Sequence, residues 1–161
     1  ASICSMIKAG IWTAAFVATC DQLSKLIILA IVMQPPRVIE ITEFFNLVLV
    51  WNRGVSFGML QSASIWGPIL LGVLTVGIIV LLFFWLREAK TRLCVIALGL
   101  VIGGALGNLM DRVLHQAVVD FLDFHISGYH WPAFNVADSA ITVGVICIIY
   151  ESLFERTEKA S

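Results

Sequence analysis

Long apolar runs separated by shorter polar segments are the main pattern in this chain of 161 residues. A membrane-spanning helix needs about 20 mostly apolar residues. Four runs meet this requirement, at about residues 7–33, 67–86, 93–112 and 136–154. The first is too long for the hydrophobic region of a signal peptide, so we interpret it as a membrane span. The pattern therefore predicts a mainly α-helical membrane protein, with residues 1–161 forming one integral membrane domain.

Two outer segments connect these helices, at about residues 34–66 and 113–135. In the first, Pro35 and Pro36 end the preceding helix, and residues 37–51 show the partial alternation and β-branched content of short strands. Large apolar and aromatic side chains are frequent there: Phe44, Phe45, Trp51, Phe57, Met59, Leu60 and Trp66. Because Trp and Phe suit the headgroup level of a bilayer, we expect a small β-sheet on the membrane surface. The second segment reads as a polar connection.

Composition agrees with a membrane protein, because 60% of the residues are hydrophobic, only 13% are charged and the mean hydropathy is +0.97. Soluble domains average about 25% charged residues. The formal net charge of -1 gives no indication of a nucleic-acid partner.

The distribution of Lys and Arg predicts how the helices are oriented, because short cytoplasmic loops carry an excess of these residues. With four spans, both termini and the connection between the second and third helices lie on one side. That side carries Lys8, Arg87, Lys90, Arg92, Arg156 and Lys159. The other side carries Arg37, Arg53 and Arg112. We therefore predict cytoplasmic termini, with both outer segments on the opposite face of the membrane.

Small and polar residues in the first and third helices predict how these helices pack. Asp21 and Lys25 are four residues apart on one helix face and can form an ion pair. This pair could hold helices together, or it could support a site above it. In the third helix, Gly99, Gly103 and Gly107 form a small-residue stripe that permits close helix packing in lipid.

The third helix ends in polar side chains on two adjacent faces. Asn108 and Arg112 continue the face of Gly104, whereas Asp111 continues the face of Gly103. Ionisable groups at the mouths of apolar helices are costly, which indicates a function. We therefore expect a functional polar cluster at the outer end of this helix.

A pair of carboxylates at this outer end is the leading candidate for chemistry. Two carboxylates held close together share one proton, and can then act as general base and general acid in peptide hydrolysis. Asp138, near the start of the fourth helix, and Asp120, in the second outer segment, could meet in this way. From the residues alone, Asp123 remains an alternative to Asp120. Asp138 could also be simply a helix cap, with Asn135 as an alternative cap.

Other chemistries find less support in the sequence. Five candidate metal ligands are close together: His115, Asp120, Asp123, His125 and His130. No HExxH or other metal-ligand spacing is present, so we expect no metal cofactor. Ser56 and Ser139 lack the GxSxG context of a serine nucleophile. Two hypotheses without hydrolysis are a proton-coupled transporter or channel, in which the intramembrane charges act as a relay, and a non-catalytic scaffold.

Five short motifs occur in order along the chain. They are Asp21-Gln22, Asn52-x-Gly54-x-x-Phe57-Gly58, Gly107-Asn108-x-x-Asp111-Arg112, Val119-Asp120-Phe121 and Phe134-Asn135-x-Ala137-Asp138-Ser139. Each motif alone is weak, but the ordered set is specific, and the chain resembles the bacterial lipoprotein signal peptidases, or type II signal peptidases. The family usually has Ala-Ala where this chain has Val55-Ser56, and both replacements are small enough to line a groove.

The resemblance implies an intramembrane aspartic endopeptidase with four transmembrane helices, a small periplasmic β-sheet cradle and a flanking periplasmic loop. Its substrate would be a diacylglyceryl-modified prolipoprotein, cleaved on the N-terminal side of the lipidated cysteine. The enzyme would act among membrane lipids at the outer face of the bacterial cytoplasmic membrane, without a cofactor. A globomycin-type cyclic peptide would inhibit it.

The motif match also implies roles for individual residues. Asp120 and Asp138 correspond to the catalytic pair, which favours Asp120 over Asp123. Site-lining positions are Asn108, Arg112 and Asn135, substrate-groove positions are Asn52 and Gly54, and a supporting position is Asp21.

Overall fold

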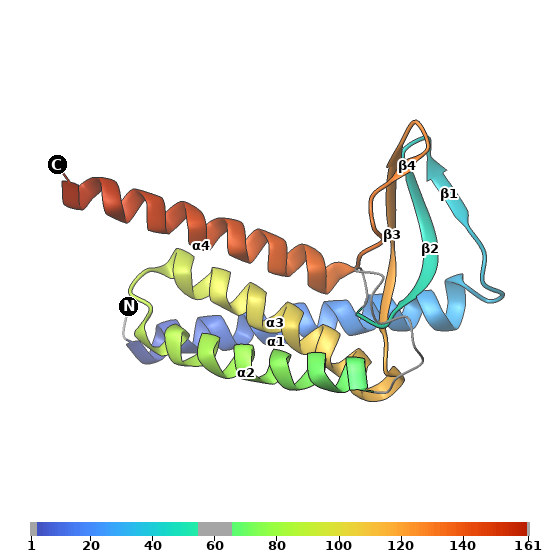
Figure 1. The fold of residues 1–161 in the computed structure, drawn as a ribbon. Helices are drawn as coiled ribbons and strands as arrows, with labels where there is room; N and C mark the ends of the chain where they lie inside the picture. The colour runs from blue at the N-terminus through green and yellow to red at the C-terminus, as the bar shows by residue number, and fades with distance from the viewer. Residues whose placement is uncertain (1–2, 55–65, 161) are drawn as a thin grey trace.

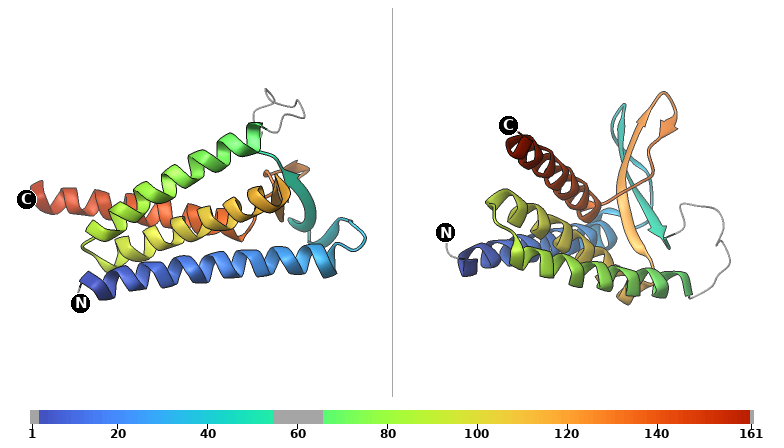
Figure 2. Two further views of the ribbon diagram at one scale, coloured as in Figure 1. Left: turned by 90° about the horizontal axis from the view of Figure 1, so that it is seen from below. Right: turned by 60° about the vertical axis from the view of Figure 1, so that its left-hand side comes forward.

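Four long helices and one small sheet make up the part of the chain that the computed structural model describes, residues 3–54 and 66–160. The elements are α1 (Ile3–Ile27), a π-helical turn η1 (Ile28–Val32), β1 (Ile39–Thr42), β2 (Phe45–Asn52), α2 (Trp66–Glu88), α3 (Arg92–His115), β3 (Val118–Ile126), β4 (Tyr129–His130) and α4 (Val136–Ala160). Figure 1 shows the sheet at one end of the helices and both termini at the opposite end. Two further views show the same separation (Figure 2).

All four helices are long and apolar enough to cross a membrane, as the hydrophobic pattern predicted. Their exposure agrees with this assignment: on α2, Leu70, Val73 and Leu81 are 68%, 65% and 70% exposed. Such surface would be costly in water, but it suits contact with lipid chains. The α3 helix differs, because it packs against α1, α2 and α4 and is largely buried.

Glycines on two faces of α3 let its neighbours approach closely, which confirms the predicted packing stripe. On one face, an added Cβ at Gly103 would lie 2.6 Å from the Ala14 carbonyl oxygen of α1. On the adjacent face, a Cβ at Gly104 would collide with the Ala137 carbonyl oxygen of α4. Each glycine face therefore has its own partner helix, and the polar residues that continue the two faces are directed toward different helices.

The sheet is antiparallel with the strand order β1-β2-β3-β4, so it draws strands from both outer segments. The strands predicted in residues 37–51 are present as β1 and β2. The second outer segment differs from the expected polar connection, because it supplies β3 and β4. Asp120 and Asp123 lie within β3, paired with Val50 and Asn46 of β2. Aspartate disfavours strands, so this strand depends on pairing with a segment far away in the sequence.

An apolar cluster fastens the sheet to the end of α1. Met33, just after η1, and Val119 of β3 are both fully buried, and they pack with Ile28 and Phe121. Because side chains alternate along a strand, burying Val119 and Phe121 on one face directs the intervening Asp120 to the other. The sheet therefore holds Asp120 in a fixed orientation.

We predict that Gly103→Ala destabilises the protein by about 1–3 kcal/mol, because the added methyl group overpacks the contact with α1. Gly77→Ala in α2 is the matched control, since nothing lies within 4 Å of a Cβ added there. That substitution should be neutral, or stabilising by up to about 1 kcal/mol through helix propensity. Thermal unfolding in detergent measures both, and equal Tm values for the two variants would contradict the packing described.

Candidate functional site

The elements α1, β2, α3, β3 and the start of α4 converge at the sheet end of the helices (Figure 1). Polar side chains from these elements form one hydrogen-bonded cluster. We call it the polar cluster. Its members are Asp21, Gln22, Lys25, Asn52, Asn108, Asp111, Arg112, Asp120, Asn135 and Asp138. The cluster also binds backbone far away in the sequence, since the Ala137 N–H donates to Asp21 Oδ1 across 116 residues.

A buried ion triad forms the base of this cluster. The Lys25 ammonium lies 2.7 Å from Asp21 Oδ2 and 2.9 Å from Asp111 Oδ2, and all three residues are at most 2% exposed. The predicted Asp21–Lys25 ion pair is therefore present, with Asp111 as an unpredicted third member. Buried charges must be paired and hydrogen-bonded to be tolerated. The triad meets this requirement and links α1 to α3.

Backbone and amide groups complete the hydrogen bonding of the two carboxylates. Asp21 Oδ1 accepts the Ala137 N–H at 2.9 Å, and Asp111 Oδ2 accepts the Val119 N–H at 2.9 Å. Gln22 donates to Asp111 Oδ1 at 2.8 Å. Through these bonds the triad holds the beginning of α4 and the strand that carries Asp120. Asp21 thus joins α1 to α3 and also lies beneath the rest of the polar cluster. The two roles predicted for the Asp21–Lys25 pair, holding helices together and supporting a site, are therefore compatible.

Asp120 is 2% exposed and receives one amide N–H on each carboxylate oxygen. Asn52 Nδ2 donates to Oδ2 at 2.9 Å, and Asn135 Nδ2 donates to Oδ1 at 2.7 Å. The Asn52 amide is oriented in turn, because its Oδ1 accepts the Gly54 N–H at 2.8 Å. Gly54 has φ +87, a conformation that favours glycine. Of the two residues predicted to line a substrate groove, Asn52 therefore donates a hydrogen bond to Asp120, and Gly54 holds the Asn52 amide in the required orientation.

Asp138 is half-buried and combines a helix cap with a contact to the cluster. The Asp138 N–H donates to Asn135 Oδ1 at 2.9 Å, and the Asn135 N–H donates to Asp138 Oδ2 at 3.2 Å. This reciprocal pair is a capping box at the start of α4. The remaining oxygen, Oδ1, accepts Asn108 Nδ2 at 2.8 Å. Asp138 therefore both caps α4 and contacts the polar cluster, and Asn135 takes part in both interactions.

Asn135 connects the two aspartates, since its side chain donates to Asp120 while its backbone N–H donates to Asp138. Burial, and to a smaller extent the nearby charge of Asp138, together raise the pKa of Asp120 to about 6, against the lowering effect of the Asn52 and Asn135 hydrogen bonds. A carboxyl group with this pKa can exchange a proton near neutral pH. The geometry thus brings Asp120 and Asp138 into one electrostatically coupled unit.

Asp123 belongs to a different environment. It lies three residues after Asp120 in β3, and successive side chains of a strand point to opposite faces. Its carboxylate accepts Asn46 Nδ2 at 3.1 Å and contacts His130 Nδ1 at 2.9 Å. Burial raises the pKa of Asp123, but these hydrogen bonds outweigh burial and hold the pKa below its ordinary value. The sequence left Asp123 open as an alternative, and the structure places it outside the polar cluster.

The histidines do not join the aspartates of the cluster. His115 lies edge-on to Trp51, with ring centroids 5.5 Å apart, and His125 stacks on His130 at 4.8 Å. Within the described ranges, no group of three His, Cys, Asp or Glu residues is arranged to hold a metal ion. Ser139 Oγ donates to the Asn135 carbonyl oxygen at 3.0 Å, a bond within the helix start.

Arg112 is half-buried beside the carboxylates. Its Nη1 donates to the Asn108 carbonyl oxygen at 3.4 Å, and its charge interacts with Asp138, Asp111 and Asp120. It thus lies within the polar cluster. Several predicted positions lie outside the described residues: Val55, Ser56, Phe57, Gly58, Met59 and Leu60.

Asp111 was expected in a polar cluster and Lys25 in a pair with Asp21, but the ion pair between Lys25 and Asp111 was not predicted. A signal for this contact was present in the pattern. Asp111 continues the face of Gly103 and Gly107, which packs on α1. A buried carboxylate on that face requires a cation from α1, and Lys25 is the basic residue of α1 near that end.

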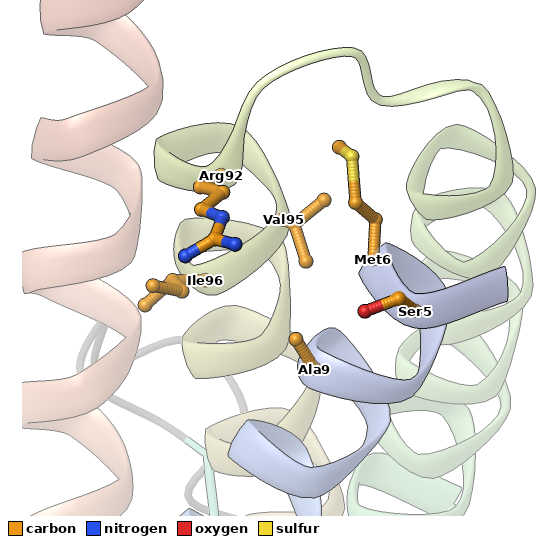
Figure 3. Close-up of a pocket in the computed structure, with 6 residues that line it drawn as sticks. All are labelled: Ser5, Met6, Ala9, Arg92, Val95 and Ile96. Carbon is orange, nitrogen blue, oxygen red and sulfur yellow. The ribbon is translucent and has the colours of Figure 1, made fainter. Parts of the chain in front are cut away.

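A separate cavity of about 230 Å³ lies at the other end of the bundle (Figure 3). It is formed between the first turns of α1 and α3 and is lined by Ser5, Met6, Ala9, Arg92, Val95 and Ile96. These residues are at the end near the termini, opposite the sheet. The cavity is therefore remote from the polar cluster and contributes nothing to it.

Comparison with known proteins identifies the family of this fold and site. The sequence model of the family described as Signal peptidase (SPase) II matches residues 13–154. The chain is 48% identical over 134 residues to the lipoprotein signal peptidases of Burkholderia vietnamiensis (strain G4 / LMG 22486) and Burkholderia multivorans (strain ATCC 17616 / 249). In both cases the match covers 83% of this chain and 80% of the relative.

Two solved structures have the same fold. Both are described as bacterial membrane enzyme structures obtained by the in meso method, at 2.3 Å and 1.9 Å resolution. Each is 35% identical in sequence, with TM-scores of 0.79 and 0.78. The first match covers 93% of this chain and 90% of the other, and the second covers 89% and 92%. The hypotheses of a transporter, a channel or a scaffold are therefore set aside, and the chain belongs to the signal peptidase II family of bacterial membrane-bound aspartic peptidases.

Proposed function

We propose that Asp120 and Asp138 are the catalytic pair with which this signal peptidase II cleaves diacylglyceryl-modified prolipoproteins. The observation that carries this proposal is the shared partner Asn135, which hydrogen-bonds both carboxyl groups at the end of an apolar bundle. The raised pKa of Asp120, about 6, supports one shared proton.

The chemistry needs one proton on the pair and one water molecule. The ionised aspartate takes a proton from water as the water oxygen bonds to the scissile carbonyl carbon, while the protonated aspartate gives its proton to the carbonyl oxygen. When the C–N bond breaks, the first aspartate protonates the leaving amine, and a hydroxyl proton of the intermediate returns to the second. The pair is then restored, and neither a metal nor a covalent intermediate takes part.

The position of the polar cluster suits a lipid-anchored substrate. Two acyl chains anchor a protein durably in the bilayer, so the scissile bond beside a diacylated cysteine remains near the membrane surface. The polar cluster lies at the sheet end of the apolar helices α1, α3 and α4, and Trp51 of β2 and Phe44 of the turn before it are exposed. We place cleavage on the N-terminal side of the lipidated cysteine.

We further propose that the site faces the periplasm, at the outer face of the cytoplasmic membrane. Both termini then lie in the cytoplasm, as the distribution of Lys and Arg supports. The start of α1, the end of α2 and the start of α3 lie opposite the sheet (Figure 1), and these segments with their connection carry Lys8, Arg87, Lys90 and Arg92.

The remaining residues of the site have supporting roles in this proposal. Asn52, held by Gly54, and Asn135 orient Asp120, while Asn108 orients Asp138. Arg112 adds positive charge near the pair, and Asp21 anchors the start of α4. Membrane lipids surround the helices, and a globomycin-type cyclic peptide inhibits the enzyme by occupying the substrate groove beside Asn52.

We predict that Asp120→Asn and Asp138→Asn each lower prolipoprotein cleavage by about 10²–10⁴-fold, because each removes one proton-transfer group. Cleavage of a diacylated substrate by purified protein measures the effect, with thermal unfolding as a check of folding. Asp123→Asn is the matched control, since this aspartate lies on the same strand but outside the polar cluster. Full activity of either pair variant, or equal loss in Asp123→Asn, would refute the assignment.

The pH dependence of kcat/KM should show the proton held by Asp120. Its pKa is raised to about 6, so the proton is present below this pH and is lost as the pH rises through it. Because kcat/KM reports groups of the free enzyme, it should fall on the alkaline side with an apparent pKa of about 6. A profile without any alkaline decline would show that this proton is not required.

Chelation separates this mechanism from a metal-dependent one. We predict that EDTA leaves the cleavage rate of purified enzyme unchanged, because the proposed steps use only carboxyl groups and water. A rate lost with EDTA and restored by added Zn²⁺ would instead support metal-activated water.

A further inference from the structure

We propose that Lys25 is a positioning residue that fixes the orientation of the Asn108 amide and thereby makes Asp138 the ionised, and Asp120 the protonated, member of the catalytic pair. This inference rests on the proposed pair and goes beyond it, because it assigns the base and the acid. It also gives a role in catalysis to a residue that lies one layer beneath the carboxyl groups.

The Asn108 side chain connects Lys25 to Asp138. Its Oδ1 accepts the Lys25 ammonium at 3.1 Å and Asn135 Nδ2 at 3.2 Å. Its Nδ2 donates to Asp138 Oδ1 at 2.8 Å. The oxygen end of the amide thus faces two donors, one of them charged, while the nitrogen end faces a carboxylate.

Reversal of this amide would be unfavourable at both ends. An ammonium group has only donors and an ionised carboxylate only acceptors. A reversed Asn108 would direct its N–H groups at Lys25 and its oxygen at Asp138 Oδ1. The conflict at Asp138 could be relieved only by protonating this carboxyl group. Lys25 therefore selects the amide orientation that favours the ionised form of Asp138.

Lys25 cannot easily turn away from Asn108. It is 2% exposed, and its ammonium is held by Asp21 at 2.7 Å and by Asp111 at 2.9 Å. The charged groups around the amide are Asp21 from α1, Asp111 and Arg112 from α3, and Asp120 from β3. Asn108 is itself 6% exposed. The two ion pairs and burial thus fix the position of the ammonium. The ammonium in turn fixes which end of the Asn108 amide faces Lys25.

The environment of the two aspartates agrees with this assignment. Asp120 is the more deeply buried carboxyl group, at 2% exposure, whereas Asp138 is half-buried. Burial disfavours the ionised form, and the pKa of Asp120 is raised accordingly. Asp138 is therefore the general base that accepts the proton of water, and Asp120 is the acid that protonates the carbonyl oxygen.

The experiment compares Lys25→Met and Lys25→Arg, with Lys8→Met as a control on the exposed, opposite end of α1. For each variant, kcat, KM and the pH profile of kcat/KM are measured per mole of folded protein. In Lys25→Met we expect kcat to fall about 10- to 100-fold with little change in KM. The acid limb of the profile should move to higher pH by about one unit or more, because ionised Asp138 loses its support.

Lys25→Arg keeps the charge and the donors, so its acid limb should lie near that of the wild type, as should that of Lys8→Met. An unchanged profile in Lys25→Met, with activity reduced only in proportion to the folded fraction, would overturn the inference and leave Lys25 a purely structural residue. The same conclusion would follow if Lys25→Arg shifted the acid limb as far as Lys25→Met.

Removing the ammonium leaves two buried carboxylates, so Lys25→Met could fail to fold. In that case the single variant Asp111→Asn is compared with the double variant that carries both Asp111→Asn and Lys25→Met. The Asp111→Asn change removes one of the two buried carboxylates from both proteins. The same shift of the acid limb is expected, and identical profiles would overturn the inference. Failure of the proposed function is distinguished by Asp120→Asn or Asp138→Asn retaining activity, whereas failure of this inference leaves both variants inactive.

Discussion

The burial of charge between closely packed helices is the constraint on which the rest of the structure depends. Lys25, Asp21 and Asp111 are all removed from solvent at the junction of α1 and α3. An uncompensated charge there would cost several kcal/mol, so every oxygen and donor in this layer needs a defined partner. Those partners include the backbone at Ala137 and Val119. The need to satisfy buried charge thus fixes where α4 begins and where β3 runs.

Close helix packing makes this charged layer possible. Gly107 of α3 faces Asp21, and a Cβ at this position would lie 2.5 Å from Asp21 Oδ2. Glycine therefore provides the space for the carboxylate and not only for a helix backbone. One turn after Gly104 comes Asn108, and one turn after Gly107 comes Asp111, so each polar side chain continues a face that a glycine begins. Along α3, the glycines that permit close helix packing are thus followed directly by the buried polar residues at the sheet end of the helix.

Much of this architecture could be predicted from local patterns. The four helices follow from apolar runs, and close helix packing at Gly103 follows from four-residue spacing, whereas its partner helix α1 is known only from the structure. Residue types alone could not separate Asp120 from Asp123, because the difference arises from strand alternation in β3. That strand was not expected, since its pairing with β2 joins distant segments. The bond from Lys25 to Asn108 spans 83 residues, beyond any periodic signal.

Asp120 and Asp138 are expected to have opposite protonation states. Infrared spectroscopy of protein with isotope-labelled aspartate, at a pH of about 5, below the pKa of about 6 for Asp120, measures this state most directly. One protonated aspartate should be detected in wild-type protein and in Asp123→Asn, and it should be absent in Asp120→Asn. A spectrum in which all aspartates are ionised, or a protonated signal that persists in Asp120→Asn, would contradict the assignment of the proton to Asp120.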